Sequence, residues 1–91
     1  MIDLKAIGEI LKKYEGWNFN LEKKCIEKEF TFKSYLKNIA FVNAIAWIAN
    51  KENHHPDLEV GYNKCVVRLT THDENGVSEK DFDMAQKINE L

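Results

Sequence analysis

The 91-residue sequence contains almost no arginine and no excess of positive charge. Arg68 is the only arginine, and the formal net charge is −2 at pH 7. A face that binds nucleic acid directly needs clustered cations, so we do not expect a nucleic-acid partner. Arginine also supplies the planar fork that grips phosphate or carboxylate through paired hydrogen bonds, so a site of that kind is not expected either.

Cysteine and long apolar runs are scarce as well. Cys25 and Cys65 lack C-x-x-C spacing, and two cysteines alone make neither a disulfide framework nor a zinc site. No apolar run is long enough to cross a membrane. Residues 1–16 mix charged and apolar side chains, which is unlike a signal peptide. These features predict a cytoplasmic protein without a membrane partner.

Apolar residues recur with helical and strand periods along a single domain of residues 1–91. Asp3 and Ser78 are expected to begin the first and last helices, and the only proline, Pro56, separates a long helix from the strand after it. The pattern predicts an α+β fold, in which a four-stranded antiparallel sheet carries three helices on one face. The expected order is helix-strand-strand-helix-strand-strand-helix, with strands near 17–21, 26–32, 57–62 and 65–71.

The predicted helix 34–51 is apolar on two sides. One side carries Leu36, Ile39, Ala40 and Trp47, and the other carries Phe41, Val42, Ile45, Ile48 and Ala49. One side can pack on the sheet, and the other needs a separate cover. The other helices of the chain could supply this cover. We favour contact with a second copy, which predicts a homodimer or homotetramer formed through helix 34–51.

All three histidines lie in two short segments, His54-His55-Pro56 and Thr71-His72. Pro56 disfavours helical backbone at His55, which places the pair between a helix and a strand. An antiparallel hairpin of strands 57–62 and 65–71 would return His72 to the start of the first strand, near His55. The spacing therefore predicts one site that contains three imidazole rings.

Several imidazoles around one cavity suit acid–base chemistry, because one ring can donate a proton while another accepts one. A zinc site is less favoured, because adjacent His54 and His55 would project in different directions and no H-x-H or H-x-x-x-H spacing exists. Surface or turn histidines without a shared role are a third interpretation. No serine or cysteine is suitably paired with a histidine for covalent catalysis.

Two further residues have alternative interpretations. Asp81 either orients a histidine or serves as the acidic residue of a helix cap. Tyr62 either lines the pocket or belongs to the core, and Trp17 and Trp47 are expected in the core.

At these residues the chain resembles the pterin-4a-carbinolamine dehydratase family, whose mammalian member is also a dimerisation cofactor of a homeodomain transcription factor. The resemblance extends over nearly the whole chain, and it departs at Asn50, where the family often has an acidic residue four positions before the first histidine. The matching positions are His54-His55-Pro56, Tyr62, His72 and Asp81, together with Trp17, Phe30-x-Phe32, Phe41-Val42 and Leu69-Thr70-Thr71-His72.

The resemblance implies dehydration of 4a-hydroxytetrahydrobiopterin to quinonoid dihydropterin, in regeneration of the tetrahydrobiopterin cofactor, without a metal or a bound cofactor. His54 and His72 would be the acid/base pair acting on the 4a-hydroxyl and the N5 proton. His55 would join this catalytic set and would also help to bind the pterin. Pro56, Tyr62 and Asp81 would contribute to pterin binding. The family forms dimers or tetramers. The alternative is a non-catalytic protein-binding or assembly module on the same scaffold.

Overall fold

The computed structural model describes residues 2–91, and these residues form the elements predicted from the sequence. A single 3-10 turn, η1, replaces part of the loop expected after the last strand. The elements are α1 (Leu4–Leu11), β1 (Asn18–Asn20), β2 (Cys25–Thr31), α2 (Tyr35–Glu52), β3 (Asp57–Val60), β4 (Lys64–Leu69), η1 (His72–Glu74) and α3 (Glu79–Asn89).

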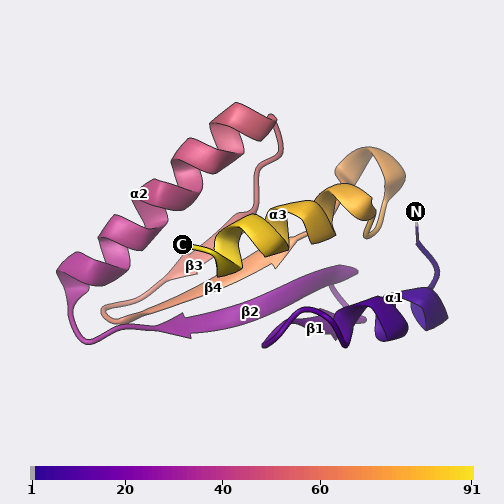
Figure 1. Ribbon diagram of the computed structural model, residues 1–91, viewed down its shortest axis with the longest axis horizontal. Coiled ribbons are helices and arrows are strands. Elements are labelled where there is room, and N and C mark those ends of the chain that lie inside the picture. The colour runs from indigo at the N-terminus through magenta and orange to yellow at the C-terminus, as the bar shows by residue number, and fades with distance from the viewer. Residues whose placement is uncertain (1) are drawn as a thin grey trace.

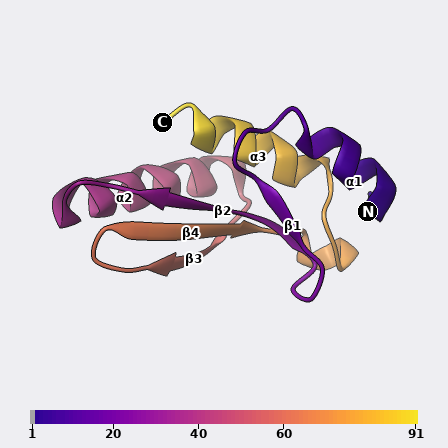
Figure 2. The same ribbon diagram turned by 90° about the horizontal axis from the view of Figure 1, so that it is seen from below.

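The described strands form one antiparallel sheet in the order β1-β2-β4-β3. Each sequential pair is a hairpin, and the two hairpins meet where β2 pairs with β4, so that Ile26 lies opposite Leu69 and Glu27 opposite Arg68. α1, α2 and α3 lie on one face of this sheet (Figures 1 and 2). The predicted α+β fold and element order are confirmed.

Short polar side chains begin the helices where the sequence predicted. Asp3 accepts a hydrogen bond from the Ala6 N–H, and Ser34 accepts one from the Lys37 N–H. Each bond satisfies a backbone donor that has no partner inside the helix. Ser78 begins α3 as part of a full capping box with Asp81, so this cap also fixes a residue of the candidate site.

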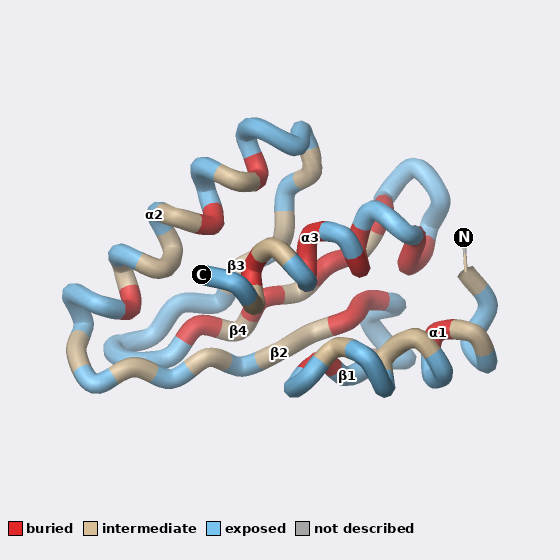
Figure 3. Tube along the Cα trace, in the orientation of Figure 1, coloured by how far each residue is buried: buried red, intermediate tan, exposed pale blue. Residues whose placement is uncertain are grey.

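The core lies between the sheet and the helices, along the inward-facing residues shown in red in Figure 3. Cys25 and Cys65 are both buried, and neither forms a disulfide. Burial raises the pKa of both thiols, so neither is poised to react as a thiolate. The main core residues are Ile26, Ile45, Ala49, Val67, Leu69, Phe82, Ala85 and Ile88.

α2 is covered on one side only. Ile45 and Ala49 are buried against the rest of the chain, whereas Leu36 is 78% exposed and Trp47 is 74% exposed. The interpretation in which other helices of the same chain cover the second side is therefore wrong, and so is the assignment of Trp47 to the core. Trp17, at 3% exposure, is a core residue as predicted. No helix within residues 2–91 is both long and apolar enough to cross a bilayer.

Candidate active site

The end of α2 places the first two histidines. Asn53 adopts a left-handed backbone with φ of 53°, which stops the helix, and the His54 N–H then donates to the Ala49 carbonyl at 3.1 Å. Pro56 follows, and β3 begins at Asp57. His54 and His55 therefore lie in a short connection between a helix and an edge strand.

The β3–β4 hairpin places the third histidine. Asp57 at the start of β3 lies opposite Arg68 near the end of β4, so the residues after Leu69 return to the level of His55-Pro56. Thr71 then pairs with Gly76 in an isolated antiparallel bridge. This bridge folds the intervening residues into the η1 turn, which His72 begins.

The three histidines line one hollow of about 270 Å³. His55 and His72 are exposed, whereas the side chain of His54 is only 15% exposed. Antiparallel pairing thus brings two segments together in the way that the hairpin geometry predicted. The hollow is completed by Asn53, Thr70, Thr71, Asp73 and Lys80.

Asp81 lies beneath His54 and is fully buried. Its Oδ1 accepts a hydrogen bond from the His54 Nε2–H at 2.6 Å. Its Oδ2 accepts from the Thr71 hydroxyl and from the Ser78 backbone N–H, each at 2.9 Å. Both interpretations of Asp81 therefore hold geometrically, since one carboxylate caps α3 and orients a histidine.

Thr71 and Ser78 extend this network, and sequence reasoning missed both as site residues. Their hydroxyl oxygens lie 2.6 Å apart and are buried. Because the Thr71 O–H donates to Asp81, the Ser78 O–H is the donor to Thr71 Oγ1. Thr71 continues the inward face of Cys65, Val67 and Leu69, so a hydroxyl on an otherwise apolar strand face was the available signal.

The network assigns the ring nitrogens of His54. Nε2 is held by a buried carboxylate, so Nδ1 is the nitrogen that remains for proton exchange with a ligand. The ring of His72 has no hydrogen-bond partner within residues 2–91, so both its nitrogens remain available. Within the same residues, no group of three or more His, Cys, Asp or Glu side chains is arranged to hold a metal ion.

Some predicted site residues lie outside the lining of the hollow. Asp81 is buried behind His54, and Pro56 precedes β3 without lining the space. Tyr62 lies in the turn after β3, separated from His55 by a four-residue strand that spans roughly 13 Å. There it stacks on Tyr35, with ring centroids 6.0 Å apart. Asn50, on the exposed side of α2, does not line the hollow either.

The sequence matches known proteins over almost its full length. The family model described as pterin 4 alpha carbinolamine dehydratase matches residues 2–91. A relative from Nitrosospira multiformis, provisionally named a pterin-4-alpha-carbinolamine dehydratase, is 52% identical over 87 residues, which cover 96% of this chain and 75% of that protein. A relative from Hydrogenovibrio crunogenus with the same provisional name is 48% identical over 88 residues, or 97% of this chain and 78% of that protein.

Two solved structures are also similar. The transcriptional coactivator/pterin dehydratase of Brucella melitensis has a TM-score of 0.91 and 35% identity, covering 97% of this chain and 94% of that one. A pterin dehydratase-like protein identified as a RuBisCO assembly factor in the alpha-carboxysome has a TM-score of 0.71 over 84% of this chain and 88% of that one. At 21% identity, that likeness concerns the fold alone. Sequence and fold agree that this chain belongs to the pterin 4 alpha carbinolamine dehydratase family.

Proposed function

We propose that this protein dehydrates 4a-hydroxytetrahydropterins, of which 4a-hydroxytetrahydrobiopterin is the expected example, to quinonoid dihydropterins. The observation that carries the proposal is the convergence of His54, His55 and His72 on one hollow, with His54 held by a buried carboxylate. Family membership supports the choice of substrate class. The hollow, at about 270 Å³, is near the ~300 Å³ lower end of small-molecule sites, as suits a compact bicyclic ligand.

The reaction needs one proton donor and one proton acceptor. The C4a–O bond breaks, the leaving oxygen takes a proton and departs as water, and the N5 proton passes to a base as the C4a=N5 bond forms. Substrate therefore equals product plus one water, with no change in oxidation state. Positioned imidazoles can supply both proton transfers near neutral pH.

Each side chain has a proposed part in this scheme. His54 exchanges a proton through Nδ1, because Asp81 holds its Nε2–H. His72 faces the same hollow from η1 and is the second member of the acid/base pair. His55 assists catalysis and binds the pterin, and Pro56 fixes the connection that carries it. Asp81 acts through His54, whereas contact between Tyr62 and the pterin requires a second copy of the chain, because Tyr62 lies at the far end of its own hairpin.

A stopped-flow assay with a synthetic carbinolamine tests the proposal. Wild-type protein is expected to accelerate dehydration above the spontaneous rate, and His54→Ala and His72→Ala are each expected to lower kcat by about a hundredfold or more. Far-UV circular dichroism and thermal melting check that both variants fold. If either variant dehydrates as fast as the wild type, the acid/base assignment is wrong.

Two observations favour a second candidate function, a non-catalytic protein-binding or assembly module. Asn50 stands where the family often has an acid, and the outer side of α2 exposes Leu36 and Trp47. Quenching of tryptophan fluorescence by pterins separates the candidates. Saturable quenching supports the enzyme, whereas the absence of pterin binding together with a stoichiometric co-purified protein supports the module.

We further propose that the outer side of α2 is a contact between copies, which makes the protein a homodimer or homotetramer. Exposed side chains as large as Leu36 and Trp47 on one helix face are typical of a surface that a partner covers. Light scattering coupled to size exclusion should give a mass above that of the monomer for the wild type, and Trp47→Lys should reduce it. Leu21→Lys, exposed in the β1–β2 connection, is the matched control that should keep the wild-type mass.

A further inference from the structure

A hollow of about 700 Å³ lies beside α1, and the proton transfers proposed above do not use it. Three segments form its walls, namely the residues that begin α1, the β1–β2 hairpin and the loop between η1 and α3. Within residues 2–91 no histidine lines it, so it is separate from the histidine hollow. We call it the apolar hollow, and its apolar lining consists of Ile2, Leu4, Ile7, Phe19, Leu21 and Val77.

The apolar hollow combines buried and exposed side chains. Ile7 and Val77 are buried, whereas Leu4 is 57% exposed and Leu21 is 67% exposed. A ligand that covers these two leucines gains roughly 25 cal/mol for each Å² of apolar surface that it removes from water. Small-molecule sites typically enclose roughly 300–1,000 Å³ and have mostly apolar linings. The size and the lining of this hollow are therefore typical of a site for a small molecule.

Two lysines without partners border the apolar hollow. Lys5 of α1 and Lys24, which precedes β2, both line it, and neither ammonium group has an ion-pair or hydrogen-bond partner within residues 2–91. The one acid among the described lining residues is Asp3, whose Oδ1 already accepts the N–H bond that caps α1. The lining therefore has an excess of positive charge, which favours an anionic group on the ligand.

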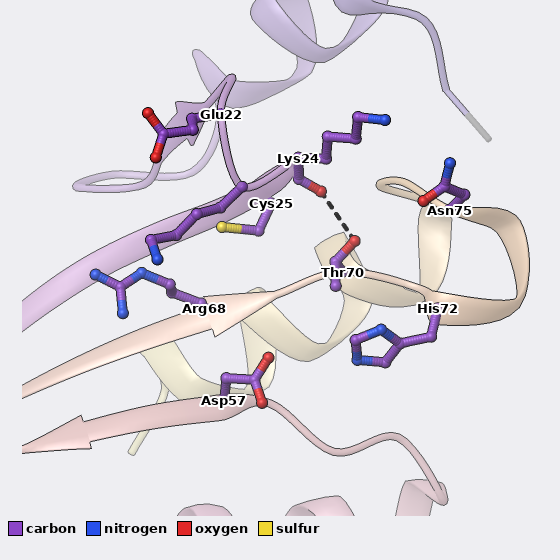
Figure 4. Close-up of a pocket in the computed structure, with 9 residues that line it drawn as sticks. Glu22, Lys24, Cys25, Asp57, Arg68, Thr70, His72 and Asn75 are labelled. Carbon is purple, nitrogen blue, oxygen red and sulfur yellow. Dashed lines mark hydrogen bonds between the residues drawn. The ribbon is translucent and has the colours of Figure 1, made fainter.

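A second hollow, of about 420 Å³, borders His72 and differs from the apolar hollow because acidic and basic side chains both line it. Lys24 and Asn75 belong to the walls of both hollows. In Figure 4 the Lys24 side chain extends away from Arg68 and toward the side on which Asn75 lies. The charge of Lys24 is therefore directed away from the mixed charges of the second hollow.

We propose that the apolar hollow binds a small amphipathic carboxylate from solution, that is, an apolar chain or ring with one anionic group. The apolar part contacts Leu4, Phe19 and Leu21, and the carboxylate lies beside Lys5 and Lys24. This inference goes beyond the proposed function, because it assigns a ligand to a surface that the acid/base residues do not reach.

Hydrogen bonds hold the walls of the apolar hollow in place before any ligand binds. The Ile2 N–H donates to the Val77 carbonyl at 2.9 Å, which joins the segment before α1 to the loop before α3. The Thr70 hydroxyl donates to the Lys24 carbonyl, also at 2.9 Å, which joins the end of β4 to the β1–β2 connection (Figure 4). Because the backbone of these walls is already fixed, a small ligand orders few groups when it binds.

Isothermal titration calorimetry with decanoate, kept below the concentration at which it forms micelles, tests the proposal. Wild-type protein is expected to bind one decanoate per chain with saturable heat. Decyltrimethylammonium has the same apolar chain and a cationic head. We expect it to bind about tenfold more weakly, because its charge has the same sign as that of the two lysines.

Variants locate the decanoate. Leu4→Glu should weaken binding about tenfold or more, since it places an acid among the apolar side chains, and an acid in the first turn of α1 suits the helix dipole, so this variant is expected to fold. Lys5→Gln and Lys24→Gln should each weaken binding about threefold. Lys13→Gln, the matched control, removes an exposed charge outside the lining and should bind like the wild type. Trp47→Lys controls for the exposed side of α2 and should also bind like the wild type.

The outcomes separate this inference from the proposed function. Equal affinity for decanoate and decyltrimethylammonium would overturn the assignment of an anionic ligand. Loss of binding in Trp47→Lys but not in Leu4→Glu would place the ligand on α2 and overturn the site. A lower mass of Leu4→Glu in light scattering would mean that a second copy of the chain covers the hollow, which also overturns the proposal. Decanoate binding needs no pterin, so its absence overturns this inference alone, and the dehydration assay tests the proposed function separately.

Discussion

The two ends of the β3–β4 hairpin are each tied to a helix by one fully buried polar side chain. At the turn, Asn38 of α2 donates its two amide N–H groups to the carbonyls of Gly61 and Lys64, at 2.8 and 3.0 Å. At the open end, Asp81 of α3 holds His54 and Thr71. Both contacts join elements that are distant in the sequence, and both satisfy polar groups that burial would otherwise leave unpaired.

The two ends differ in what the buried group holds. Asn38 binds backbone carbonyls only, and its own Oδ1 has no hydrogen-bond partner within residues 2–91, so its effect is confined to fixing the turn. Asp81 binds a ring that can titrate and whose other edge borders a hollow. At either end, the buried polar side chain stabilises the fold. It can also contribute to catalysis only where the group that it binds borders a cavity.

The largest effect is expected from Asp81→Asn. An amide cannot accept from His54, Thr71 and Ser78 together, and its own N–H groups would face donors. We expect the free energy of unfolding to fall by about 3 kcal/mol, because charge-assisted bonds in a buried site are lost. Dehydration should slow by about ten- to hundredfold, because the His54 ring loses its fixed orientation. Urea denaturation and stopped-flow kinetics measure the two effects. Unchanged kcat in a folded variant would remove Asp81 from the mechanism.

Asn38→Ala probes the other end of the hairpin. Two buried carbonyls lose their donors, which should lower the free energy of unfolding by about 2 kcal/mol. Because Asn38 is remote from the histidine hollow, kcat at a temperature where the variant is folded should stay within about twofold of wild type. A loss of activity as large as that of Asp81→Asn would contradict the proposed division between the two ends.

Thr71→Val tests the hydrogen-bond network at the open end of the hairpin, because it removes one hydroxyl and keeps the shape of the side chain. Oδ2 of Asp81 loses one of its two partners, and the Ser78 hydroxyl loses its acceptor. We expect a loss of about 1 kcal/mol in the free energy of unfolding and a decrease of a few fold in kcat. Thr71→Ser, which restores the hydroxyl, should recover kcat. Equal kinetics for the Val and Ser variants would show that the hydroxyl does not act through His54.

The smallest effect is expected on the outer face of the sheet, where Glu27 of β2 lies opposite Arg68 near the open end of the hairpin. Burial tends to raise the pKa of Glu27, but hydrogen bonds from Arg68 and Asn20 outweigh it and hold the pKa below the ordinary 4.5. The lowered pKa means that this stabilisation is present above pH 4.5 and is lost as the pH falls through the folded-state value. Glu27→Gln should cost about 0.5 kcal/mol at pH 7, because the pair is partly exposed.

The measurement is how the difference in unfolding free energy between wild type and Glu27→Gln changes with pH. Denaturation curves for wild type and Glu27→Gln should differ at pH 7 and converge as the pH falls below 4.5. Glu29→Gln, an exposed residue on the same strand, is the matched control and should show a smaller difference at every pH. A difference that grows on acidification would mean that the sign assigned to Glu27 is wrong.

Local sequence predicted the elements of this protein because their signals are carried by residues close in the chain. Asp3, Ser34 and Ser78 mark helix starts through bonds within one turn. Alternation correctly placed Cys65, Val67 and Leu69 of β4 in the core, whereas Val60 and Tyr62 of the preceding alternating segment are exposed. The hairpin argument brought His72 to His54 and His55, because antiparallel pairing constrains where a chain returns. The apolar second side of α2 was also visible, since helical spacing alone defines it.

Tertiary packing determined the contacts between distant residues, which no local sequence pattern predicts. The approach of α3 to β4 places Asp81 within reach of both His54 and Thr71, and this depends on how a helix seats on a sheet rather than on any spacing. The same packing puts Tyr62 against Tyr35 and opens a second hollow at His72. Sequence determined which groups and elements this protein has, and three-dimensional packing determined which groups share a cavity, because contacts between distant segments are set by shape and burial.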